Sequence, residues 1–182
     1  MPSPLPRRTP EDRIRRATVA DGASSFDGFP PIDWIKDTGA PVSPVLVTWA
    51  AGQCAVLPIG ICWDVVRLPI DTGSEALRQL HALGSTIGPA IASLDSVEVL
   101  VPVHSADAWD LPGCSVLQIG EHLVAPSPLF GAPSGVDGRT WLHRPGADCA
   151  LTNGDDLYAA FAAALATVSE ETAPSTSPRG RP

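Results

Sequence analysis

Short apolar runs alternate with turn residues through the middle of this 182-residue chain. The run 62–68 predicts a strand, and the segment 74–83 that follows predicts a helix with one apolar face. We expect Asp71 or Thr72 to cap this helix and Gly84 to end it. Many α/β enzymes carry catalytic carboxylates where such a strand meets such a helix.

The end of this strand lacks the chemistry of a catalytic site. Its last positions hold Arg67, Leu68 and Pro69, which neither bind a metal ion nor transfer a proton at neutral pH. The junction therefore has the layout of an active site without carboxylates at the expected positions.

Shorter patterns predict the remaining elements and an α+β fold with a mixed or antiparallel sheet and a few packing helices. The run 97–101 is almost wholly apolar, which is typical of a central strand, so Glu98 must point to a special site or lie at an edge. The other expected elements are a helix at 44–51, a strand at 54–58, a hairpin of 89–93 with 97–103, a second hairpin of 115–119 with 122–125 around Gly120 and Glu121, a strand at 140–143, and a helix at 155–168 capped by Asn153 or Asp155.

Composition predicts one domain with a tail at each end. Residues 1–31 are rich in Pro, Arg, Ser and Gly and predict a disordered tail, and 169–182 have the same character. Residues 32–168 are expected to form a single α+β domain. No run is long and apolar enough to span a membrane, and no apolar segment follows the N-terminal arginines as in a secretory signal, so we expect no membrane contact and a cytoplasmic location.

The charges are unevenly distributed. The chain has 12 basic and 20 acidic residues, but between Ala17 and Val168 five basic residues stand against 16 acidic ones. Proteins that hold nucleic acid by its phosphates need a basic surface. We therefore do not expect nucleic acid to bind the acidic core, although the Arg-rich N-terminal tail could contact it.

Cysteine and histidine spacing indicates neither a metal site nor a cofactor, and only a zinc site assembled from distant segments stays open. The four cysteines and four histidines are dispersed: Cys54, Cys62, Cys114, Cys149, His81, His104, His122 and His143. Isolated cysteines of this kind usually behave as small apolar residues.

Several short motifs nevertheless occur in a familiar order. The single residues are Trp49, Gly73, Ala76, Leu77 and Leu80. The segments are 55–60 (Ala-Val-Leu-Pro-Ile-Gly), 63–69 (Trp-Asp-Val-Val-Arg-Leu-Pro), 88–89 (Gly-Pro), 99–102 (Val-Leu-Val-Pro), 120–126 (Gly-Glu-His-Leu-Val-Ala-Pro) and 141–145 (Trp-Leu-His-Arg-Pro). From about Val45 to Leu165, the chain resembles the actinobacterial bifunctional primase-polymerase N-terminal family of the archaeo-eukaryotic primase group. The resemblance implies a core like the sheet of the RNA-recognition motif.

The family's catalytic residues do not carry over to this chain. Its metal-binding Asp-x-Asp pair matches Arg67 and Pro69. Its histidine lies on a strand that matches about 96–100, where the chain has none, and its third carboxylate matches a position near Ser115. Two-metal catalysis needs several oxygen ligands. Asp64 does not replace them, because a residue three positions before Arg67 on a strand points to the other face. The resemblance therefore implies a shortened, degenerate relative.

Four residues are candidates for an anion or nucleotide site. Arg67 could bind a phosphate or carboxylate, or it could pair with a nearby acid such as Asp64, Asp71 or Glu98. Arg139, His143 and Arg144 lie along one strand and its exit and could complete an anion site, or they could be ordinary polar residues of an edge strand.

Other polar and aromatic residues offer weaker signals. His104 with Asp107 or Asp110 could act as a general base, but no nucleophile lies at a motif-like position nearby, and Ser127 is not in a nucleophile elbow. Trp34 and Trp109 lie in loop-like contexts, where each could anchor a partner or pin its loop to the core.

The sequence thus favours a non-catalytic binding or regulatory protein that acts through a protein partner or self-association. The alternative is a nucleotide-binding or nucleic-acid-processing enzyme with relocated metal ligands.

Overall fold

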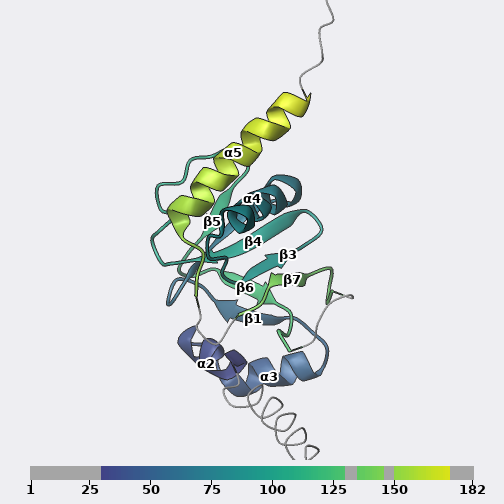
Figure 1. Ribbon diagram of the computed structural model, residues 1–182. Coiled ribbons are helices and arrows are strands. Elements are labelled where there is room, and N and C mark those ends of the chain that lie inside the picture. Colours follow the sequence, from purple (N-terminus) through teal and green to yellow (C-terminus); the bar gives the residue numbers. More distant parts are fainter. Residues whose placement is uncertain (1–29, 130–134, 146–149, 173–182) are drawn as a thin grey trace, which may run out of the picture. The chain divides into compact units, whose positions relative to one another are not determined.

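The computed structural model describes residues 30–129, 135–145 and 150–172 (Figure 1). Its main sheet has five antiparallel strands in the order β5-β2-β4-β3-β7. Their bounds are β2 Asp64–Pro69, β3 Ala90–Ala92, β4 Ser96–Val101, β5 Ser115–Leu117 and β7 Thr140–His143. The position of β4 in the middle confirms that its apolar run forms a central strand.

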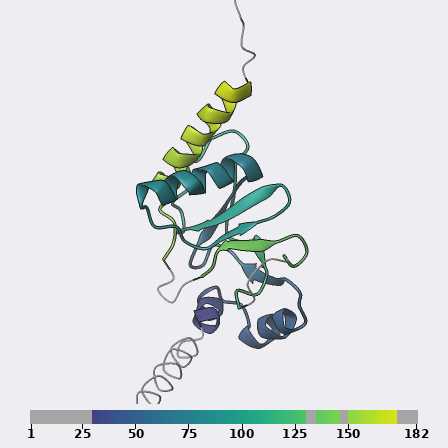
Figure 2. The same cartoon turned by 45° about the vertical axis from the view of Figure 1, so that its right-hand side comes forward.

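Helices α4 (Ile70–Leu83) and α5 (Gly154–Thr172) cover one face of this sheet, as Figures 1 and 2 show. Buried side chains of the two helices form one hydrophobic cluster with alternate residues of β2 and β4. These strand residues are Val66, Leu68, Val97, Val99 and Val101. Alternation along a strand sends the residues between them to the opposite face.

The ends of the two helices test the expected caps. Helix α4 begins at Ile70, directly after Pro69, and has no side-chain cap, so the prediction of a cap at Asp71 or Thr72 was wrong. Both residues instead lie in its first turn. Gly84 ends the helix with φ 71°, as expected. In α5 the backbone N–H of Asp156 donates to Asn153 Oδ1 at 3.0 Å, which confirms Asn153 as the cap.

On the opposite face lie two helices and a two-stranded antiparallel ribbon. The helices are α2 (Pro30–Asp37) and α3 (Val42–Ala50), and the β1–β6 ribbon consists of Ala55–Pro58 and His122–Ala125. Their core includes Trp34, Trp49, Leu57, Leu100 and Leu123. Trp34 lies in helix α2 rather than in the loop that its Pro- and Asp-rich context suggested, and its ring stacks on that of Trp63 at 6.0 Å.

The prediction of a hairpin between β5 and β6 was wrong. A turn does form, because the N–H of Glu121 donates to the carbonyl of Gln118 at 3.0 Å. However, β5 pairs with β2, whereas β6 crosses to pair with β1. This register places Leu123 and Ala125 in the core beside β1, and the Trp49 indole donates to the Ala125 carbonyl at 2.9 Å. Burial in that second core outweighs the local preference for a hairpin.

None of the helices in the described part of the chain is long and apolar enough to cross a membrane. The N-terminal tail up to residue 29 and the end from residue 173 lie outside the described residues. Helix α5 continues to Thr172, beyond the expected end at 168.

Candidate functional site

Arg67 lies at the centre of a row of three residues on adjacent strands. In the antiparallel register it is directly opposite Glu98 of β4 on one side and Ser115 of β5 on the other. Glu98 is 2% exposed, and its Oε1 accepts from Arg67 Nε at 3.0 Å and from a terminal nitrogen of Arg67 at 2.8 Å. The sequence left Asp64, Asp71 and Glu98 open as acidic partners of Arg67, and in the structure the partner is Glu98.

Arg139 approaches the same carboxylate from the segment before β7. One terminal nitrogen donates to Glu98 Oε2, and its Nε donates to the Val124 carbonyl at 2.7 Å. Arg139 therefore links β4 of the main sheet to β6 of the ribbon. With both guanidinium groups in place, both oxygens of Glu98 accept charge-assisted hydrogen bonds.

A hollow of about 400 Å³ opens beside this cluster. Its charged lining consists of Arg67, Arg139, Glu98, Asp95 and Asp137. Three carboxylates thus face two guanidinium groups, and this balance of charge does not attract an anion. Uncharged residues that line the same hollow include Ser93, Ser96 and the exposed Leu94.

His143 and Arg144 do not join Arg67 and Arg139. His143 lines a separate hollow of about 330 Å³ with His81 and Leu77 of α4, and Arg144 is exposed beyond the end of β7. Burial lowers the pKa of His143, and the nearby His81 lowers it further. The four residues expected to form an anion site therefore separate into one pair at Glu98 and two dispersed residues.

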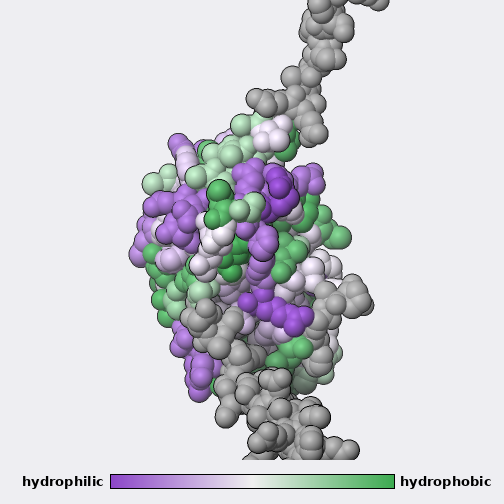
Figure 3. All heavy atoms as spheres, in the orientation of Figure 1, coloured by the Kyte–Doolittle hydropathy of each residue, from purple (hydrophilic) through white to green (hydrophobic). Residues whose placement is uncertain are grey.

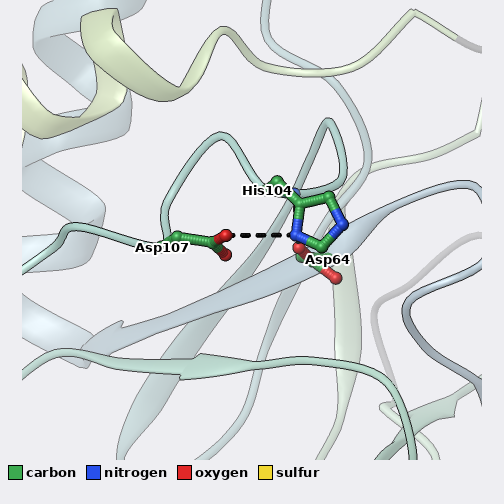
Figure 4. A group of neighbouring side chains, drawn as sticks. All are labelled: Asp64, His104 and Asp107. Carbon is green, nitrogen blue, oxygen red and sulfur yellow. Dashed lines mark hydrogen bonds and ion pairs between the residues drawn. The ribbon is translucent and has the colours of Figure 1, made fainter.

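A second group of polar side chains was only partly anticipated (Figure 4). His104 Nδ1 lies 3.1 Å from Asp107 Oδ2, and the backbone N–H of His104 donates to Asp64 Oδ2 at 2.8 Å. One potential ligand atom from each of the three residues lies within 4.8 Å of the others. Asp110, the other acid considered for His104, instead accepts from the hydroxyl of Tyr158 at 3.1 Å.

Asp64 is the member that reasoning from the sequence missed. It is 1% exposed, and its Oδ1 has no hydrogen-bond partner among the described residues. An unsatisfied buried acceptor costs about 1–3 kcal/mol, so such an atom requires an explanation. The available signal was an acid at the start of an apolar strand, but nothing in the sequence indicated that the 102–107 loop covers it.

The remaining candidates, Trp34, Trp109 and Ser127, make contacts within the protein itself. Trp34 is 2% exposed and belongs to the core, which fits the reading of a Trp that pins its segment. Trp109 is half-buried and meets the ring of Tyr158 edge-on at 5.2 Å. Ser127 Oγ accepts from the N–H of Leu129 at 3.3 Å within a local turn.

The cysteines with resolved pKa shifts are poor nucleophiles. Burial is the main cause that raises the pKa of the Cys54 and Cys114 thiols, so both stay protonated near neutral pH. Neither cysteine therefore has the lowered pKa of a catalytic thiol.

Comparison with known proteins finds no family model, no curated protein and no solved structure that matches this chain. The described residues define an α+β protein with antiparallel sheets and four helices.

Proposed function

We propose that this protein is a non-catalytic binding protein on a degenerate primase-polymerase-like scaffold, acting through contacts with protein chains. The observation that carries the proposal is the ion pair between Arg67 and the buried Glu98. Arg67 occupies a position that matches a metal-binding aspartate of the primase-polymerase family.

The arrangement around Arg67 is unsuited to two-metal catalysis. Divalent cations in such sites need several oxygen ligands with negative charge. Both oxygens of Glu98 accept hydrogen bonds from guanidinium groups, and Ser115 across the strand offers a hydroxyl group instead of a carboxylate. The two arginines would also repel a cation placed beside Glu98.

The sheet supports the choice of scaffold. The resemblance matches the family's catalytic residues to Arg67 and Pro69 on β2, to about 96–100 on β4 and to a position near Ser115 on β5, and these strands are neighbours. Arg67 faces Glu98 within the 96–100 stretch and faces Ser115 directly. A single row of this kind is what a former catalytic site on adjacent strands would leave.

The β1–β6 ribbon supports contacts with protein. Val56 and Val124 lie directly opposite one another and are both exposed, and Ile61 and Ile119 are exposed near the end of the ribbon. On the face drawn in Figure 3, hydrophobic and hydrophilic residues are interspersed, so apolar side chains gather in small patches. We therefore assign the contact between chains to the exposed, directly opposed pair Val56 and Val124.

The non-catalytic part is tested with nucleotides and metal ions. We expect purified full-length protein to show no saturable binding of a fluorescent deoxynucleoside triphosphate at millimolar Mg²⁺ or Mn²⁺, and no primer extension. An active primase-polymerase serves as the positive control. Saturable, metal-dependent binding of the nucleotide, or primer extension, would instead support the alternative, an enzyme with relocated metal ligands.

The protein-contact part is tested by sedimentation. Self-association through the ribbon predicts a mass that rises with concentration, and a Val56→Ser, Val124→Ser double variant should remain a monomer. A Leu83→Ser variant is the matched control, because Leu83 is equally apolar and is exposed on α4. A wild-type monomer at every concentration, or equal association of the double variant, would contradict self-association through this surface.

A further inference from the structure

We propose that Asp64, His104 and Asp107 form a binding site for one divalent transition-metal ion, with Zn²⁺ as the preferred ion. This inference is independent of the proposed function, because the site is separate from the Arg67–Glu98 pair. Three observations carry it: the convergence of three ligand side chains, a buried carboxylate oxygen without a partner among the described residues, and an open path from solvent.

The three residues come from two segments that the fold brings together. Asp64 begins β2, whereas His104 and Asp107 lie in the connection from β4 to β5. Asp64 is opposite Val101, the last residue of β4, so the loop that leaves β4 passes beside its carboxylate. In Figure 4 the imidazole of His104 faces the carboxylate of Asp107, and the carboxylate of Asp64 overlaps the ring in this view.

The buried oxygen of Asp64 is the independent sign of a ligand. Its other oxygen accepts the N–H of His104, but Oδ1 has no hydrogen-bond partner in the described part of the chain. A buried carboxylate oxygen is normally satisfied by a hydrogen bond or by a metal ion. A cation held with His104 and Asp107 would satisfy it.

The spacing of the ligand atoms is close to what a metal ion requires. Ligand atoms at about 2.0–2.1 Å from a tetrahedral Zn²⁺ lie about 3.4 Å from one another. His104 Nδ1 and Asp107 Oδ2 are already 3.1 Å apart, and the largest separation in the group is at most 4.8 Å. Small side-chain rotations of the two loop residues would therefore close the site.

A neighbouring side chain already orients one ligand. Gln118 Nε2 donates to Asp107 Oδ1 at 2.6 Å, which leaves Oδ2 directed at His104. Such outer hydrogen bonds are typical of metal ligands, whose orientation they fix. Gln118 follows β5, so the site would join three parts of the chain: β2, the β4–β5 connection and the end of β5.

The choice of metal follows from the ligand types and from access. One imidazole and two carboxylates suit Zn²⁺ or Mn²⁺ better than Mg²⁺ or Ca²⁺, which favour oxygen ligands alone. The side chains of His104 and Asp107 are 77% and 49% exposed, whereas Asp64 lies at the base. An ion can therefore enter from solvent and keep an open coordination position.

The proposal is tested by titrating Zn²⁺ into metal-free, reduced full-length protein in a calorimeter. We expect one ion per chain and saturable binding in the micromolar range. Asp107→Asn and His104→Gly should each weaken binding at least about tenfold. Because His104 has φ 64°, glycine there removes backbone strain together with the imidazole, so loss of binding would not reflect unfolding.

Two matched variants serve as controls. His122 and Asp71 are exposed residues outside the group, so His122→Ala and Asp71→Asn should bind Zn²⁺ as the wild type does. Zn²⁺ should also raise the melting temperature of the wild type and of both controls, but not that of His104→Gly. The absence of saturable binding up to millimolar Zn²⁺, or unchanged binding in both His104→Gly and Asp107→Asn, would overturn the proposal.

Discussion

Arg67 on β2 and Glu98 on β4 are directly opposite one another in the sheet, with a terminal guanidinium nitrogen 2.8 Å from the carboxylate. The two partners differ in exposure, since the Arg67 side chain is 43% exposed and that of Glu98 is 3% exposed. Arg139 reaches the same carboxylate from a third segment. Glu98 is thus the buried centre of a cluster that joins the main sheet to the β1–β6 ribbon.

Replacing Glu98 by Gln should lower the free energy of unfolding by about 3–5 kcal/mol, because Arg139 would stay largely buried without a counter-charge. Arg67→Met should cost less, about 1 kcal/mol or below, since solvent already screens that pair. Urea denaturation of both variants measures the difference. Equal losses for the two would show that Glu98 is not the centre of the cluster.

Gly60→Ala should destabilise the protein more than Gly120→Ala. Both glycines have positive φ, 86° and 94°, so each substitution carries a backbone cost of about 1–2 kcal/mol. A Cβ on Gly60 would also lie 2.5 Å from the backbone of Ile119, whereas one on Gly120 would meet nothing within 4 Å. Thermal unfolding of the two variants isolates this close contact, and equal melting temperatures would refute it.

Stability should fall as the pH drops from about 8 to 5, in part because of His143. Its pKa is lowered in the folded protein, whereas the unfolded chain has the ordinary value of about 6.5. The unfolded state therefore binds the proton more readily, so stability is lost as the pH falls from above 6.5 through the folded pKa. The melting temperature of His143→Gln should fall less over this range than that of the wild type.

His122→Gln provides the control for this titration, because His122 is exposed on β6. Its melting temperature should follow that of the wild type at each pH. If His143→Gln shows the same loss as His122→Gln, the acid sensitivity arises from other groups.

Trp34→Ala should lower the free energy of unfolding by about 3–5 kcal/mol, because Trp34 is buried between Trp63 and Trp141. Trp109→Ala should cost less, since Trp109 is half-buried against Tyr158. Chemical denaturation of both variants tests this order. A larger loss for Trp109 would contradict it.

Local patterns predicted the elements whose partners are close in sequence. The strand and helix around Arg67, the stop at Gly84 and the cap at Asn153 depend on a few neighbouring residues, and the structure has all of them apart from the expected cap of α4. The pairing of Arg67 with Glu98 was open from the sequence, because several acids were equally plausible partners.

Strand pairings that depend on the hydrophobic core around the β1–β6 ribbon could not be predicted from local sequence patterns. Residues 115–125 have the pattern of a hairpin, yet β6 pairs with β1, which lies more than 60 residues earlier in the chain. Nothing in the local sequence distinguishes these outcomes, because the strand that pairs with β6 is distant in the chain. Asp64 and His104 are 40 residues apart, so their contact was equally hidden.

The sequence by itself determined the α+β class, the central position of β4 and the Arg-Leu-Pro end of β2 without a carboxylate, because periodicity and residue chemistry are local properties. The tertiary structure alone decided which strands pair, which acid receives Arg67 and Arg139, and which side chains surround Asp64. Those outcomes depend on burying apolar surface between distant segments, and that burial is a property of the whole packed chain.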